Sequence, residues 1–209
     1  MPTRRSVLSA WLATAGGVVP DAGPLAFRVI RKDTAIGSHG FTFVREGDRL
    51  TVSIAADIAV GFGPFTLFRY RHRAVERWQG DMFLGIEAET DDNGTKYKVS
   101  VRREDGGLRV VRTSGASYLA PDNALAATHW NQRMLSGPMI NNQTGDLMRP
   151  AVASVGPESV RLFSGASVRA DHFTLRGDAD LDTWYEPSSA WAGLRFTGKD
   201  GSAIRYERV

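Results

Sequence analysis

The chain has 209 residues, with 26 Lys and Arg set against 23 Asp and Glu, and it contains no Cys. This length fits one domain with a substantial core. The lack of Cys excludes disulfides, thiolate metal sites and cysteine nucleophiles. The net charge of +3 comes from mixed charges without a concentrated basic patch, so we expect no nucleic-acid partner.

Residues 1–22 have the pattern of an export signal. The pair Arg4-Arg5 precedes a short, weakly apolar run that ends at Val19, and cleavage is expected near Ala22. This pattern is typical of a twin-arginine signal peptide, with an ordinary secretory signal as the alternative. No later segment is apolar enough to cross a bilayer. We therefore expect a periplasmic or secreted protein that does not span the membrane.

Residues 25–209 are predicted to form a single antiparallel β domain. The stretch "LTVSIAADIAV" alternates between apolar and more polar residues, which places its apolar side chains on one face of a strand. Turn signals recur at 45–49, 61–64, 91–94, 104–107 and 198–202. Such a series predicts one strongly curved antiparallel sheet, a half-barrel or open barrel of about 10–12 strands, with one short helix or lid segment.

One hairpin register can be predicted from the sequence. A two-residue turn at Asn93-Gly94 pairs apolar with apolar and acid with base. The expected pairs are Thr90–Tyr97, Ala88–Val99, Ile86–Val101, Asp91–Lys96 and Glu89–Lys98. A further turn at Asp105-Gly106 brings Val110 opposite Val101.

Arg69, Arg71, Arg73 and Arg77 share one face of the preceding strand. They form either a cationic stripe for a phosphate or lipid headgroup, or one side of a cross-strand charge ladder. A three-residue turn at 79–81 places Arg73 opposite Glu87 and Arg71 opposite Glu89. A two- or four-residue turn would reverse the parity, so the turn length decides whether the stripe is charge-compensated.

The sequence favours a helix in only one region, residues 120–135. Asp122 could cap this helix, Ala and Leu favour it, and Gly137-Pro138 would end it. Strands are expected to resume at about 146–155, 158–163, 167–176, 179–186, 190–197 and 202–208. The segment between the two runs of strands is the crossing from one half of the sheet to the other.

No motif assigns a catalytic or metal site. The four histidines lack metal-ligand spacing, and no G-x-S-x-G sequence is present. Asp178, Asp180 and Asp182 resemble the start of a calcium loop, but the Gly and Glu that such a loop needs are missing. We predict no catalytic residue, no metal and no cofactor.

The crossing region gathers the best candidates for ligand binding. Trp130 offers an apolar plate with one N–H donor, the amides can hydrogen-bond a neutral ligand, and His129 can donate or accept. The predicted ligand-binding residues are His129, Trp130, Asn131, Asn142, Gln143, Trp184 and Tyr185. The alternative is that Trp130 plugs one end of the sheet and the amides shape turns.

Several stretches resemble an uncharacterised family of exported proteobacterial β-proteins, a domain of unknown function. They include "YRHRAVERWQGDMFLGIEAETDDNG", "THWNQRM", "NNQTGDL" and the end "TWYEPSSAWAGLRFTGKDGSAIRYERV". The positions that carry the resemblance are Glu76, Trp78, His129, Trp130, Asn131, Gly145, Trp184 and Tyr185. The resemblance implies a curved antiparallel sheet, similar in outline to half-barrel lipid and lipoprotein carriers, and no established activity.

The leading functional hypothesis is non-enzymatic binding of a lipid or other amphiphilic molecule on the concave face, with 121–142 as a lid or plug. One alternative is a small exported hydrolase or isomerase that uses His129 with a nearby carboxylate. Another is an accessory protein that binds a co-exported partner through an apolar patch outside the concave face.

Overall fold

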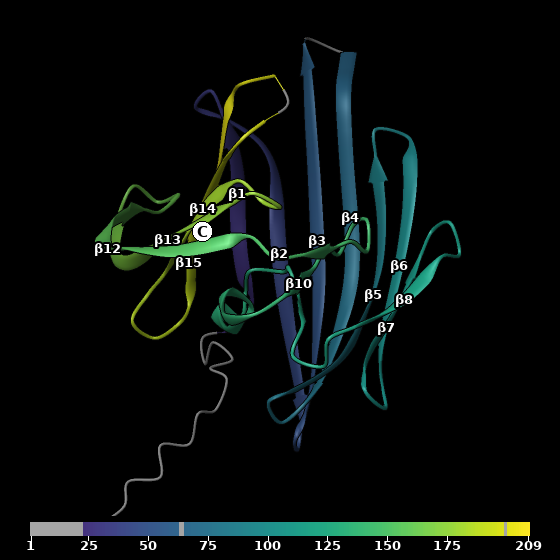
Figure 1. The fold of residues 1–209 in the computed structure, drawn as a ribbon. Coiled ribbons are helices and arrows are strands. Elements are labelled where there is room, and N and C mark those ends of the chain that lie inside the picture. The colour runs from purple at the N-terminus through teal and green to yellow at the C-terminus, as the bar shows by residue number, and fades with distance from the viewer. Residues whose placement is uncertain (1–22, 63–64, 199) are drawn as a thin grey trace, which may run out of the picture.

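The computed structural model describes residues 23–62, 65–198 and 200–209. The export signal predicted for 1–22 lies outside the described residues. The described residues form one large sheet and one small sheet joined by irregular segments (Figure 1).

The large sheet contains 13 strands in the order β12-β13-β14-β15-β16-β1-β2-β3-β4-β5-β6-β7-β8. These strands are β1 (Leu25–Arg31), β2 (Thr34–Glu46), β3 (Arg49–Phe62), β4 (Phe65–Gln79), β5 (Met82–Asp92), β6 (Thr95–Glu104), β7 (Gly107–Arg112), β8 (Ser117–Ala120), β12 (Ala151–Arg161), β13 (Ser167–Arg176), β14 (Leu181–Tyr185), β15 (Trp191–Thr197) and β16 (Ala203–Arg208). The last strand pairs with the first, and β12 and β8 are the two edges. The sheet is curved and not closed (Figure 1), which confirms the predicted fold class.

The small sheet belongs to the crossing between the two halves. It contains β9 (Leu125–Ala126), β10 (Met139–Ile140) and β11 (Leu147–Met148), and a short 3₁₀ helix, η1 (Gln132–Ser136), lies between β9 and β10. The helix predicted for 120–135 is wrong in extent and type. Residues 117–120 are β8, and 125–126 pair in parallel with β10, because this segment buries alternate side chains against the sheet instead of one helical face.

Alternation in the sequence decides which face of the sheet is buried. On β3, Val52, Ile54 and Ala56 are buried, whereas Ser53 and Ala55 between them are exposed. The β5–β6 hairpin has the predicted register, including Ala88 opposite Val99. Val110 of β7 faces Val101 of β6, also as predicted.

The β4–β5 turn differs from the prediction. Gln79 pairs with Met82, so the turn has two residues, and a bulge at Leu84 then restores the parity: Trp78 pairs with Phe83 and Arg77 with Gly85. Gly85 adopts φ +152, and a Cβ there would lie 2.0 Å from a backbone oxygen of β6. Only glycine fits this bulge.

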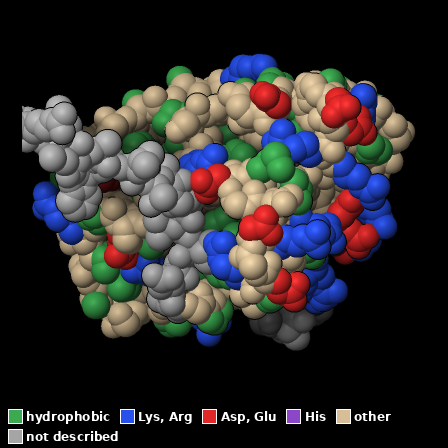
Figure 2. Space-filling view, turned by 90° about the horizontal axis from the view of Figure 1, so that it is seen from below, with side chains coloured by type: hydrophobic (Ala, Val, Ile, Leu, Met, Phe, Trp, Pro, Cys, Tyr) green, Lys and Arg blue, Asp and Glu red, His purple; other side chains and the backbone are tan. Residues whose placement is uncertain are grey.

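As a result, the predicted partners of the arginine stripe are wrong by two residues. Arg73 faces Glu89, and Arg71 faces Asp91. Both arginines form ion pairs with Asp57 of β3, at 2.6 Å for Arg73 and 3.3 Å for Arg71. Positive and negative side chains are interspersed on the face seen in Figure 2. In the described part of the chain neither Arg69 nor Arg77 has an ion-pair partner, so the stripe is compensated in part.

Among the described residues, no helix has the length and apolar character needed to cross a membrane.

Candidate functional site: two ends of the concave face

The crossing segment, residues 121–146, packs against the concave face of the sheet. Its Ala124, Ala126, Trp130 and Ile140 belong to the same buried core as the inner side chains of β1–β7. In Figure 1 this segment passes in front of β3 and β4. One end of the concave face is therefore filled by the chain itself, and we call it the plugged end.

Trp130 is the centre of the plugged end. Its indole Nε1 donates a hydrogen bond to Oε2 of Glu76 at 2.8 Å, and Nε1 of Trp78 donates to the same oxygen at 2.9 Å. The Trp130 ring packs edge-on against Trp78 and Phe43, with centroids 5.7 and 5.4 Å away. Because Trp130 is only 3% exposed and anchored in this way, it closes a core.

Glu76 is an acid inside that core, with 1% of its surface exposed. Burial raises the pKa of its carboxyl group, and the side chains of Thr128, Trp78 and Trp130 work in the opposite direction by favouring the charged form. Its second oxygen, Oε1, has no hydrogen-bond partner among the described residues. Glu76 is thus a buried polar link between β4 and the crossing segment.

His129 precedes Trp130 and adopts the left-handed conformation, with φ 67. Its carbonyl oxygen accepts a hydrogen bond from Tyr185 at 2.8 Å, and its ring stacks on Trp191 at 5.3 Å. Burial lowers the pKa of His129 to about 4, which keeps the ring neutral near pH 7. In the described part of the chain no carboxylate is hydrogen-bonded to this ring, so the acid–base pair required by the hydrolase hypothesis is not formed.

His72 lies on the inner face of β4. Its Nδ1 is 2.8 Å from Oγ1 of Thr90, and its Nε2 is 3.4 Å from the amide nitrogen of Asn142 in the crossing segment. Burial, followed by the charge of Arg73, lowers the pKa of His72 to about 4. Asn142 therefore packs against a neutral imidazole at the margin of the plugged end.

His39 occupies the same row of the sheet, because both His39 and His72 pair with Ala56. Both ring nitrogens of His39 are buried without a hydrogen-bond partner among the described residues, and the ring packs on Phe41 at 4.5 Å. Burial, with smaller contributions from His129 and His72, lowers its pKa to about 3.

The other end of the concave face is open. Here a cavity of about 510 Å³ lies between β1–β5, β15, β16 and the turn at 141–146. Such a volume is typical of small-molecule sites. Most of the wall is apolar, including Val29, Ile36, Ile58, Val60, Phe196 and Ile204. Trp130 does not line this cavity.

A hydrogen-bonded chain of three side chains lines one edge of the cavity. The hydroxyl of Tyr70 donates to Oε1 of Gln143 at 3.2 Å, and Nε2 of Gln143 donates to Oδ2 of Asp92 at 3.3 Å. All three side chains line the cavity. Burial, together with the charge of Asp92, raises the pKa of Tyr70 to about 12, so the phenol stays protonated.

A second polar pair lies elsewhere on the cavity wall. Arg31 forms an ion pair with Asp200, and its Nε donates to Oγ of Ser202 at 2.9 Å. Hydrogen bonds from Ser202 and Arg31 hold the pKa of Asp200 well below its usual range. Both partners are therefore charged and already engaged with each other.

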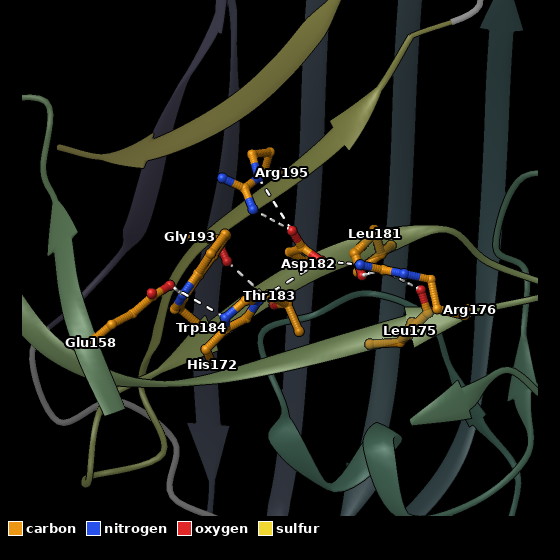
Figure 3. Close-up of polar contacts among 10 residues, drawn as sticks. All are labelled: Glu158, His172, Leu175, Arg176, Leu181, Asp182, Thr183, Trp184, Gly193 and Arg195. Atoms are coloured by element: carbon orange, nitrogen blue, oxygen red, sulfur yellow. Dashed lines mark hydrogen bonds and ion pairs between the residues drawn. The ribbon is translucent and has the colours of Figure 1, made fainter. Parts of the chain in front are cut away.

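Trp184 lies on the opposite face of the sheet, in a polar cluster shown in Figure 3. Its ring stacks on His172 with centroids 4.7 Å apart, and its indole N–H donates to Glu158. Nearby, Asp182 accepts from Arg195 at 2.5 Å and from Arg176 at 2.6 Å. Burial acts to raise the pKa of Asp182, but the hydrogen bonds of Arg176 and Arg195 lower it. These contacts hold β12 and β13 against β14 and β15.

The residues predicted as a ligand site therefore do not form one site. Gln143 lines the cavity, and Asn142 contacts His72 beside it. Trp130 and Tyr185 belong to the buried core, and the partly buried His129 contacts Tyr185 and Trp191. Asn131 caps η1, where its Oδ1 accepts from the backbone N–H of Arg133 at 3.1 Å. Trp184 is on the far face.

Sequence reasoning missed Tyr70, Asp92 and Arg31 as cavity residues. Tyr70 alternates with the arginines of β4, so its inward orientation could have been read from the same pattern. Asp92 and Gln143 are 51 positions apart, and no spacing signal connects them.

Within the described ranges, no group of three or more His, Cys, Asp or Glu side chains is arranged to hold a metal ion. Asp178 and Asp180 of the calcium-like stretch accept backbone N–H groups of Arg149 and Gly177, as expected for turn residues.

Comparison with known proteins gives a family and a fold. The model of DUF6134, a domain of unknown function, matches residues 27–209. No curated protein matches the chain. Among solved structures, the chain resembles the crystal structure of a beta-barrel-like protein of domain of unknown function DUF1849 from Brucella abortus, with a TM-score of 0.61 and 10% identity. The match covers 89% of this chain and 95% of that one, and at this identity it concerns the fold alone.

Proposed function

The chain belongs to the DUF6134 family, and from this premise we propose that it is a non-enzymatic carrier of an amphiphilic small molecule, bound at the open end of the concave face. The observation that carries the proposal is the cavity of about 510 Å³, whose wall is mainly aliphatic and aromatic and has a polar edge on one side. Apolar walls with few, well-placed polar groups are typical of small-molecule sites.

The plugged end of the same face supports this proposal by contrast. The crossing segment fills that end with Trp130 and fixes it through Glu76, but its side chains leave the space between Ile58 and Ile204 open. An apolar cavity that the described residues leave unfilled forfeits packing contacts. A bound apolar tail would restore them.

We also propose that the protein works outside the cytoplasm, on the strength of the Arg4-Arg5 pattern at its start. A carrier of a sparingly soluble molecule in an aqueous compartment is consistent with this location.

The test is native mass spectrometry after incubation with a bacterial lipid extract. Residues 23–209 should retain one small molecule per chain. The variant Ile58→Phe should retain clearly less, because the larger side chain takes up part of the cavity. Asp57→Ala, a change of the neighbouring residue whose side chain lies on the opposite face, should retain the ligand as the wild type does.

Retention by Ile58→Phe at the wild-type level would place the ligand elsewhere. A wild-type protein that is folded and retains nothing would refute the carrier function.

A further inference from the structure

The charged side chains that line the cavity differ in whether they have an ion-pair partner. Three ionised side chains line it: Arg31, Asp92 and Asp200. Arg31 and Asp200 neutralise each other in an ion pair. Asp92 has no ion-pair partner among the described residues, and its hydrogen bond comes from the neutral amide of Gln143. The cavity wall therefore carries one uncompensated negative charge.

This charge lies beside aromatic rings. Asp92 is the cross-strand partner of Tyr70, and the rings of Tyr70, Phe68 and Tyr206 all line the cavity. A carboxylate next to aromatic faces is suited to a cationic group, which gains both the ion pair and the attraction of the ring faces. The phenol of Tyr70 remains neutral here because burial and Asp92 raise its pKa to about 12.

We infer that the ligand is a cationic amphiphile: a protonated amine head contacts Asp92 and Tyr70, and its alkyl tail lies along Ile58 and Ile204. This inference rests on the proposed carrier function and adds the chemical class of the ligand. It assigns Asp92 as the residue that determines specificity and Gln143 as the side chain that holds its carboxylate in place.

The same geometry disfavours an anionic head. A fatty-acid carboxylate or a phosphate at this edge would meet Asp92 in a half-buried, mainly apolar setting, where like charges repel more strongly than in water. Arg31 could attract an anion only by giving up Asp200 and Ser202, which already accept from its guanidinium. A neutral alcohol would bind through its tail without the charge contribution.

Three ligands with the same ten-carbon tail test the inference: decylamine, decan-1-ol and decanoate. Their dissociation constants are measured near pH 7 by competition against a neutral apolar fluorophore, below the concentration at which each aggregates. Decylamine should bind about two- to fivefold more tightly than decan-1-ol, a gain of the size measured for exposed ion pairs. Decanoate should bind most weakly.

Two variants identify the residue responsible. Asp92→Asn should bring the affinity for decylamine down to that for decan-1-ol and leave decan-1-ol unchanged. Asp91→Asn is the matched control, because Asp91 lies one position away and pairs with Lys96. It should keep the wild-type preference. Thermal melting of both variants establishes that each is folded.

The outcomes separate the two proposals. Binding of all three ligands with equal affinity, or with decanoate tightest, overturns the cationic class and leaves the carrier function standing. A preference for decylamine that survives in Asp92→Asn overturns the role of Asp92. No binding of any of the three by the folded wild-type protein refutes the carrier function and the inference together.

Discussion

The plugged and open ends of the concave face are built on the same strands yet differ in what fills them. At the plugged end, β4 presents Glu76 and Trp78, and the crossing segment inserts Trp130 between them and Phe43. At the open end, β3 and β4 present Ile58 and Tyr70, and among the described residues no side chain fills the space as Trp130 does at the plugged end.

This difference shows that a curved sheet needs a separate element to fill its concave side. Alternation along a strand turns apolar side chains inward, but a strongly curved sheet leaves more space than those side chains occupy. In this protein the crossing segment fills only the plugged end. The remaining space is the cavity.

The largest expected effect concerns the plug itself. Trp130→Ala should lower the free energy of unfolding by about 3–5 kcal/mol, because it leaves a cavity and removes one of the two indole donors to Glu76. Trp130→Phe, which keeps most of the volume but lacks the N–H, should cost clearly less. Urea unfolding of both variants measures the difference. Equal costs would mean that the hydrogen bond, and not the volume, holds the plug.

The second prediction concerns pH and His39, which lies between the two ends. Its folded pKa of about 3 lies below the value of 6.5 of a free histidine, so the unfolded chain binds the proton first. Its contribution to stability is complete above pH 6.5 and falls as the pH drops, by about 2 kcal/mol between pH 7 and pH 5. His39→Phe removes a ring whose nitrogens have no partner among the described residues.

The variant should therefore lose less stability than the wild type between pH 7 and pH 5. The raised pKa of Glu76 acts in the opposite sense, since stability from that group falls as the pH rises above 4.5. Glu76 is common to both proteins, so the difference between them isolates His39. An identical acid sensitivity would show that this ring is not neutral and buried.

A matched pair on β3 compares the ends directly. Ile54 and Ile58 share the inner face, but Ile54 is 2% exposed within the core and Ile58 lines the cavity. Ile54→Phe should cost about 1–3 kcal/mol through overpacking, whereas Ile58→Phe should cost less than about 1 kcal/mol because its ring enters open space. Thermal unfolding compares them. A penalty at Ile58 as large as at Ile54 would mean that the open end is packed.

The smallest effect is expected on the outer face, away from both ends. Asp57→Ala removes the ion pairs to Arg71 and Arg73, and these groups are about half exposed. Its cost should be about 0.2–1 kcal/mol and should shrink in high salt. A loss of several kcal/mol would place the charge ladder among the main determinants of the fold.

Much of the fold follows from the sequence because a period of two is a strong signal. The β5–β6 register came from a two-residue turn that matches Ala88 with Val99 and acid with base. The β4–β5 register was not predictable in this way, because the bulge at Leu84 depends on how Gly85 approaches β6. The predicted helix failed because helix propensity at Ala124 and Ala126 is weaker than the gain from burying these residues against the sheet.

The candidate site was less accessible to prediction. Trp130 was identified as either a plug or a ligand contact, and its bond to Glu76 depends on a contact across 54 positions. The cavity is a space between elements, so no local pattern encodes it. Of its polar edge, only Gln143 was named in advance.

Fluorescence titration of N-phenyl-1-naphthylamine, a neutral apolar probe, tests the central claim most directly. The wild type should show saturable binding of one probe per chain, Asp57→Ala should match it, and Ile58→Phe should clearly weaken it. Equal binding by the wild type and Ile58→Phe, or no binding by the folded wild type, would contradict a ligand cavity at the open end.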